Sequence, residues 1–168
     1  IYGRIAEGLR DVFRTERPVV TATGSATLLM EAAIASCVRE RSLHLVNGAF
    51  SDRWFQIALS RDKKPDKVEV PAGAPVPPDL VREALRRGRY DAVTVVHSET
   101  STGVLNPVEE IARVVREESD ALVLVDAVSS LGGARVETDD WGLDVVLTAS
   151  QKAPVSYTHL TLPTKRIV

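Results

Sequence analysis

The sequence predicts an α/β fold in which a mostly parallel sheet carries helices on both faces. The predicted strands are near-continuous runs of Val, Leu and Ala, as in residues 91–97 and 121–127, which is typical of strands buried on both faces. They alternate along the chain with amphipathic helical patterns, the arrangement that a parallel sheet requires. The 168 residues are 44% hydrophobic, which suits about one domain with a substantial core.

The expected elements follow one another without linkers or repeats. The chain opens with a helix over residues 1–13, where apolar residues recur at helical spacing before Pro18. A second helical pattern, over residues 26–39, begins directly behind a Gly-Ser turn. The remaining helices are expected over residues 50–60, 77–88 and 107–118, and the strands over residues 18–24, 42–48, 67–71, 91–97, 121–127 and 143–150.

Charge and cysteine content argue against several kinds of partner. The chain has 21 basic and 23 acidic residues and a net charge of -2, so we expect no partner among nucleic acids or anionic membranes. The single cysteine, Cys37, cannot form an internal disulfide, and no apolar run approaches the roughly 20 residues of a spanning helix. We therefore expect a cytoplasmic protein. Its three histidines, at positions 44, 97 and 159, lack ligand spacing, so no metal site is expected.

Small polar clusters follow most of the predicted strands. Ligands of parallel α/β sheets collect beyond the carboxyl ends of the strands, because the loops diverge there. The clusters are TGSAT (23–27), NGAF (47–50), HSETSTG (97–103), DAVSS (126–130) and SQK (150–152). In the first, Gly24 and Ser25 precede a helix start whose free N–H groups would bind a phosphate. Taken alone, such a turn is more often an ordinary capped helix start, and no GxGxxG or GK[ST] pattern indicates a nucleotide site.

Three functional candidates stand at the ends of apolar strands. Asp126 follows five apolar residues, where a buried carboxylate is costly unless it meets a cation or an N–H group. Its alternative role is to cap the following turn through Val128 and Ser129. Lys152 stands just beyond the last strand, a position where a lysine is usually solvated. His97 is expected to be a hydrogen-bonded strand-end histidine rather than a catalytic one.

One cofactor, pyridoxal phosphate, requires a phosphate seat, an acid and an amine together. Its phosphate suits a helix N-terminus, its pyridine nitrogen needs a carboxylate that keeps it protonated, and its aldehyde forms a Schiff base with a lysine. The protonated ring withdraws the electrons left when a bond to the substrate α-carbon breaks. The freed lysine then moves a proton between the α-carbon and the cofactor. We expect Phe50 to stack on one face of the ring and Val128 to press on the other.

The five clusters, in this order, resemble the class V aminotransferases of fold type I, and most closely the branch of alanine–glyoxylate, serine–glyoxylate and serine–pyruvate aminotransferases. The segments are TGSAT, NGAFSDRW, HSETSTGVLNP, LVDAVSSLGG and GLDVVLTASQKA, and the similarity runs from about Pro18 to Ala153. The resemblance implies a Schiff base at Lys152 and a pyridine nitrogen bound by Asp126. It also implies the other cofactor contacts: Ser25, Ala26, Thr27 and Gln151 at the phosphate, Phe50 stacked on the ring, Thr100 near the ring hydroxyl and Val128 beneath the ring.

The resemblance implies transfer of an amino group from alanine or serine to glyoxylate or pyruvate by a homodimeric enzyme that uses pyridoxal phosphate. Residues 1–153 would be part of its large cofactor-binding domain, with the small C-terminal domain absent, and residues 154–168 would be a non-native or unstructured tail. Three alternatives remain: an inactive fragment of such an enzyme, a lyase of the same fold such as a cysteine desulfurase, and a phosphonate-type aminotransferase. Phe50 and Gln151 stand where desulfurases typically have histidines, which favours the aminotransferase.

Overall fold

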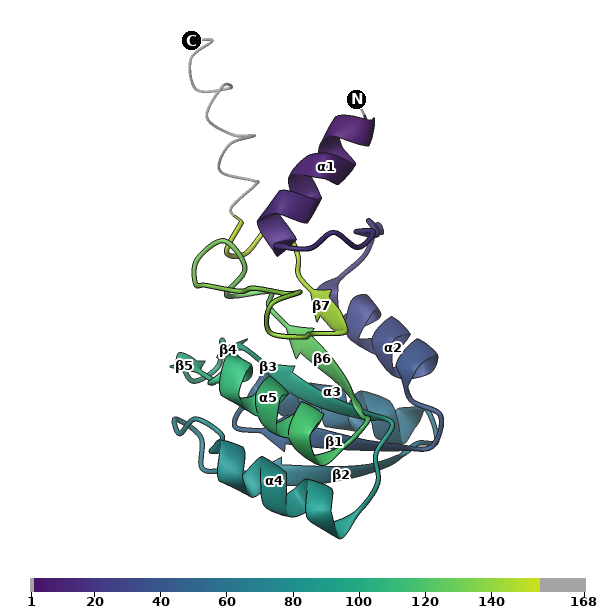
Figure 1. Cartoon of the computed structure of the whole chain (residues 1–168), viewed down its shortest axis with the longest axis vertical. Coiled ribbons are helices and arrows are strands. Elements are labelled where there is room, and N and C mark those ends of the chain that lie inside the picture. The colour runs from purple at the N-terminus through teal and green to yellow at the C-terminus, as the bar shows by residue number, and fades with distance from the viewer. Residues whose placement is uncertain (1, 155–168) are drawn as a thin grey trace.

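Five parallel strands form the central sheet of the computed structural model, which describes residues 2–154 (Figure 1). The strands are β1 (Arg41–Val46), β2 (Lys64–Glu69), β3 (Ala92–Val96), β6 (Leu122–Asp126) and β7 (Val145–Leu147), and their spatial order is β2-β1-β3-β6-β7. Every neighbouring pair is parallel, so the predicted α/β fold class is confirmed. Residues 155–168, nearly all of the predicted tail, lie outside the described residues.

Helices cover both faces of the sheet, as the sequence predicts. They are α1 (Tyr2–Phe13), α2 (Ala26–Cys37), α3 (Ala49–Ser60), α4 (Pro78–Arg87) and α5 (Val108–Glu118). Helices α4 and α5 lie on one face and α2 and α3 on the other, while α1 projects beyond the β7 side (Figure 1). Within the described part of the chain, no helix is both long enough and apolar enough to span a bilayer.

Successive side chains of a strand point to opposite faces of the sheet and belong to two separate hydrophobic cores. Val123 of β6 belongs to the same buried cluster as Ile111 of α5, whereas the next residue, Leu124, belongs to the cluster that contains Trp54 of α3. The Trp54 indole N–H donates to the Met30 carbonyl of α2 at 3.2 Å, which joins the two helices on that face. The sheet is therefore held rigidly from both sides, and the loops at its edges start from fixed positions.

Several predicted boundaries differ from the structure. Residues 18–24, expected as a strand, form no regular element, and Val20 is 84% exposed. Strand propensity depends on cross-strand packing, and no described strand pairs with this segment. The expected strand at 67–71 is β2, displaced toward the N-terminus, and the one at 143–150 shortens to the three residues of β7. The sequence reading also missed a short antiparallel hairpin, β4 (Ser98–Glu99) with β5 (Val104–Leu105).

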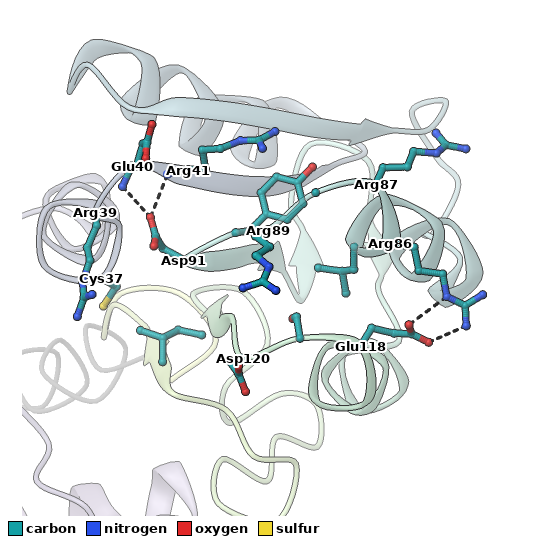
Figure 2. Close-up of a pocket in the computed structure, with 15 residues that line it drawn as sticks. Cys37, Arg39, Glu40, Arg41, Arg86, Arg87, Arg89, Asp91, Glu118 and Asp120 are labelled. Atoms are coloured by element: carbon teal, nitrogen blue, oxygen red, sulfur yellow. Dashed lines mark hydrogen bonds and ion pairs between the residues drawn. The ribbon is translucent and has the colours of Figure 1, made fainter.

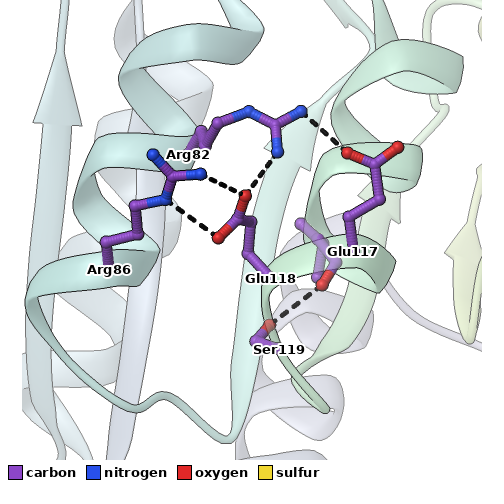
Figure 3. A network of polar contacts seen from close by, with 6 residues as sticks. Arg82, Arg86, Glu117, Glu118 and Ser119 are labelled. Carbon is purple, nitrogen blue, oxygen red and sulfur yellow. Dashed lines mark hydrogen bonds and ion pairs between the residues drawn. The ribbon is translucent and has the colours of Figure 1, made fainter.

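An ion-pair network joins the C-terminal ends of α4 and α5 (Figure 3). Arg82 pairs with Glu117 at 2.8 Å and also with Glu118, and Arg86 pairs with Glu118 at 2.9 Å. The Ser119 hydroxyl donates to a carbonyl of the last turn of α5 at 3.1 Å. Because water reaches these side chains, the pairs stabilise the fold only modestly, but they hold α4 beside α5.

Candidate functional site

Four polar loops lie at one edge of the sheet, where the parallel strands have their carboxyl ends. The loops are residues 47–51 after β1, 97–103 after β3, 126–130 at the end of β6 and 148–152 after β7. The strand register places Asp126 between Val96 of β3 and Leu147 of β7. The loops after β3 and β7 therefore leave the sheet on either side of Asp126, at the edge where parallel α/β proteins bind ligands.

Asp126 is a buried carboxylate with one hydrogen bond from the protein. The residue is 4% exposed, and its Oδ1 accepts the Val128 N–H at 2.8 Å, so the turn-capping role is present. Burial raises the pKa of Asp126 to about 6; the Val128 N–H opposes this rise and the charge of Glu99 adds to it. Among the described residues, none donates to Oδ2 and no basic side chain neutralises the charge. This oxygen is suited to an N–H donor on a ligand.

The loop that carries Lys152 packs on the loop that follows β6. The Ala153 N–H donates to the Val128 carbonyl at 3.4 Å, and the Ala153 side chain lies against Gly133. Lys152 and its neighbour Gln151 are exposed. The structure therefore shows the solvated lysine that is usual after a strand, at the same edge of the sheet as the buried carboxylate.

The N-terminus of α2 opens toward this same edge. Helix α2 ends just before β1 begins at the opposite edge, and its 12 residues span about 18 Å, close to the length of a strand. Ser25 caps the helix from an extended conformation, with its Oγ accepting the Leu28 N–H at 3.4 Å. Ala26 and Thr27 begin the helix, where backbone N–H groups have no partner within it. The ordinary cap is thus present, and the phosphate seat stays a prediction.

Phe50, Thr100 and Val128 come from three different loops of this edge. Phe50 and Val128 are both partly buried and pack against the same core cluster. The Arg53 guanidinium lies 4.9 Å from the centre of the Phe50 ring. The Thr100 hydroxyl lies 2.5 Å from the Ser129 hydroxyl, which joins the loop after β3 to the loop after β6. Direct contacts thus bring together the loops after β1, β3, β6 and β7, whereas topology alone places the start of α2 beside them.

Sequence reasoning missed the buried acid Glu99. This residue has no exposed surface, and its carboxylate accepts the Ser51 N–H at 2.9 Å and the Ser101 hydroxyl at 2.7 Å. The available signal was an acid standing among small polar residues directly after a buried strand. His97 behaves as predicted: its Nδ1 lies 3.0 Å from the Ser130 hydroxyl, and burial lowers its pKa to about 4, so the ring is neutral.

A broad hollow lies at the opposite, amino edge of the sheet (Figure 2). Its lining includes Arg89 and Glu118. The Asp91 carboxylate there accepts the backbone N–H groups of Glu40 at 2.6 Å and Arg41 at 2.9 Å. None of the predicted cofactor residues lines this hollow, so the candidate site is the carboxyl edge.

A family model described as aminotransferase class-V matches residues 52–156, well over half of the 168 residues. The chain belongs to the class V aminotransferase family. Among its relatives, an uncharacterised aminotransferase of Methanocaldococcus jannaschii is 40% identical over 95% of this chain. Alanine–glyoxylate aminotransferase 1 of Saccharomyces cerevisiae is 35% identical over 91% of this chain. The crystal structure of an alanine–glyoxylate aminotransferase from Nostoc sp. matches 89% of this chain with a TM-score of 0.84 and 35% identity.

These matches confirm the predicted class V family and fold. The chain spans 43% of the length of each of the two sequence relatives and 40% of the Nostoc chain. The range matched by the class V model includes Thr100, Asp126 and Lys152, whereas Ser25 and Phe50 precede it.

Proposed function

We propose that the protein binds pyridoxal phosphate and transfers an amino group from a small amino acid, alanine or serine, to a keto acid, glyoxylate or pyruvate. One observation carries this proposal: the buried carboxylate of Asp126, which no described cation neutralises, stands at the edge that also carries the Lys152 loop. Membership of the class V family supports the cofactor. Two of the relatives described above are named for alanine and glyoxylate, which supports these substrates.

The residues at the carboxyl edge fit pyridoxal phosphate in three respects. Asp126 offers Oδ2 to a ring N–H, since the Val128 N–H occupies Oδ1. The start of α2 offers backbone N–H groups and the positive end of a helix dipole to the phosphate, worth about 0.3–2 kcal/mol for the dipole. Lys152 offers an exposed amine on a loop that contacts Val128. The remaining proposed contacts are those of the sequence prediction: Ser25, Ala26, Thr27 and Gln151 at the phosphate, Phe50 and Val128 on the two ring faces and Thr100 at the ring hydroxyl.

When bound, the cofactor supplies an aldehyde that captures amines and a ring that withdraws electrons from the substrate α-carbon. Above a pH of about 6, Asp126 is ionised and would accept a hydrogen bond from a protonated pyridine nitrogen. Lys152 Nζ serves as the base that takes a proton from the substrate α-carbon. Phe50 and Val128, both bordering an apolar core, exclude water from the two sides of this proton transfer.

The proposal extends to the whole enzyme. Residues 1–153 form part of its large cofactor-binding domain, and a small domain supplies the arginine that binds the substrate carboxylate. The enzyme would be a cytoplasmic homodimer that acts on free amino and keto acids, without nucleic acid or membrane partners. The chain spans 43% of the length of each of the two sequence relatives, which supports a whole enzyme that has a further domain.

The alternative is that this polypeptide binds the cofactor without turnover, which the same 43% coverage favours. Mixing the cofactor-loaded polypeptide with alanine and measuring pyruvate separates the two. Pyruvate formation that is lost in Lys152→Ala supports the transferase, and cofactor binding without pyruvate supports the silent fragment.

Borohydride trapping tests the cofactor assignment. The 168-residue protein is mixed with pyridoxal phosphate, reduced with borohydride and digested, and the modified peptide is identified by mass spectrometry. We expect the adduct at Lys152, retained in the control Lys64→Ala, whose exposed amine pairs with Glu40 at the far edge of the sheet. An equal adduct yield in Lys152→Ala would refute the assignment.

A further inference from the structure

The carboxylate of Glu99 connects two segments that lie far apart in the sequence. Its Oε2 accepts the Ser51 N–H at 2.9 Å, and its Oε1 lies 3.3 Å from the Phe50 N–H donor and 2.7 Å from the Ser101 hydroxyl donor. A further bond comes from the Ser101 N–H at 3.2 Å, and the Ser51 hydroxyl lies 3.0 Å from Oε2. One buried group thus holds the first turn of α3 to the turn after β3.

The backbone at Gly48 approaches Glu99 so closely that a side chain at this position would displace Glu99 or Ser101. A Cβ atom at Gly48 would lie 2.4 Å from the Glu99 Cγ and 2.5 Å from the Ser101 Oγ. The Ser101 hydroxyl also accepts the Ala49 N–H at 2.9 Å, which closes the contact from the other side. The two segments are therefore interlocked, and neither can shift without breaking several hydrogen bonds.

Glu99 is an anion although no cation pairs with it in the described part of the chain. Burial opposes its ionisation, but hydrogen bonds from Ser101 and Ser51 outweigh burial and hold the pKa of Glu99 below its ordinary value. Its carboxylate also lies at the N-terminus of α3, where the helix dipole favours negative charge. The protein therefore keeps a buried charge at this edge at neutral pH, using only N–H and O–H donors.

The interlocked segments carry two of the predicted cofactor contacts. Phe50 donates its backbone N–H to Glu99, and Thr100 follows Glu99 directly and reaches the Ser129 hydroxyl. We propose that Glu99 is a positioning residue of the cofactor site, which fixes the Phe50 ring and the Thr100 hydroxyl relative to Asp126. This inference rests on the proposed function, because it assigns Glu99 a role toward the same cofactor.

Glu99→Gln tests the inference with a side chain of the same shape. The amide nitrogen that replaces one oxygen presents donors to the donors of Ser51 or Ser101, so the interlock loosens. We expect pyridoxal phosphate to bind about tenfold more weakly, as for the loss of about one charge-assisted hydrogen bond. We also expect altered visible circular dichroism of the bound cofactor, because this signal reports how the protein holds the ring.

Asp91→Asn is the matched control, because Asp91 also accepts two backbone N–H groups but lies at the opposite edge of the sheet (Figure 2). It should lower the unfolding temperature while leaving cofactor affinity within about twofold and the circular dichroism unchanged. Ser101→Ala, which removes one hydroxyl from the interlock, is the milder second variant should Glu99→Gln fail to fold. We expect Ser101→Ala to shift both the affinity and the circular dichroism in the same direction as Glu99→Gln.

Wild-type affinity and circular dichroism in folded Glu99→Gln or Ser101→Ala would overturn the positioning role and leave the proposed function intact. Failure of the wild-type protein to bind pyridoxal phosphate, or full trapping in Lys152→Ala, would overturn the proposed function itself. The two failures appear in different samples and are therefore distinguishable.

Discussion

Asp126→Asn is expected to stabilise the protein at pH 8 when it is prepared without cofactor, and to weaken cofactor binding. The wild-type carboxyl has a pKa of about 6 in the folded protein against an ordinary value of 3.8. Between these values the folded state binds the proton more tightly than the unfolded state, so the free energy of unfolding falls as pH rises from about 4 to about 6. At about 1.36 kcal/mol per pH unit, ionising Asp126 costs the fold about 3 kcal/mol by pH 8.

The asparagine variant avoids this cost and keeps the one hydrogen bond that the Asp126 side chain accepts from the protein. Its Oδ1 still accepts the Val128 N–H, but its amide brings new donors whose desolvation costs about 1–2 kcal/mol. We therefore expect a net gain of about 1–2 kcal/mol at pH 8, shrinking as the pH approaches 4. Urea unfolding followed by the fluorescence of the buried Trp54 measures this difference across pH.

Asp91→Asn is the control, because its effect on the free energy of unfolding at pH 8 should have the opposite sign. Burial opposes ionisation of Asp91, but backbone N–H groups at Glu40 and Arg41 outweigh it and lower the pKa of Asp91. Its contribution to stability is therefore present above the unfolded pKa and lost as pH falls, so the asparagine variant should be destabilised at pH 8. An Asp126→Asn protein that is less stable than wild type at pH 8, with an unchanged pH dependence, would refute the reasoning.

Three further predictions concern packing and buried polar groups. Trp54→Ala should lower the free energy of unfolding by about 3–5 kcal/mol, because it leaves a cavity in the core. Trp54→Phe also loses the hydrogen bond to the Met30 carbonyl, which should cost about 1 kcal/mol in addition to the change in packing. Urea unfolding measures both differences. Gly48→Ala should cost at least about 1–3 kcal/mol, because its Cβ overlaps Glu99; a wild-type melting temperature would contradict this. Burial lowers the pKa of His44 from 6.5 to about 3, so the free energy of unfolding decreases as the pH falls between these values. His44→Gln should therefore make the free energy of unfolding less dependent on pH between 6.5 and 4. An unaltered dependence would contradict this prediction.

Local sequence patterns predict the buried strands and the strand-end acid. The Val and Leu runs of β3 and β6 identify a sheet covered on both faces, and an acid directly after such a run, Asp126, lies buried at its end. The same reasoning fails for residues 18–24, because β-branched residues indicate a strand only where another strand pairs with them. Pairing is a property of the fold and not of the segment.

Non-local contacts explain why Glu99 was missed. Two of its donors, the N–H groups of Phe50 and Ser51, lie 49 and 48 residues away along the chain. No spacing rule connects such positions, since they meet only after β1 and β3 pair side by side. Lys152 shows the converse limit: its position in a loop after the last strand could be predicted, whereas the partner proposed for it is a ligand and not another residue.

We propose that an acid, an amine and a helix start converge on one flat heterocycle at the carboxyl edge of the sheet. A crystal structure of the 168-residue protein with pyridoxal phosphate measures this convergence directly. We expect electron density that joins Lys152 Nζ to the cofactor, a pyridine nitrogen about 3 Å from Asp126 Oδ2 and a phosphate on the N–H groups at the start of α2. A cofactor bound elsewhere, or Lys152 and Asp126 contacting opposite faces of the sheet, would contradict this convergence.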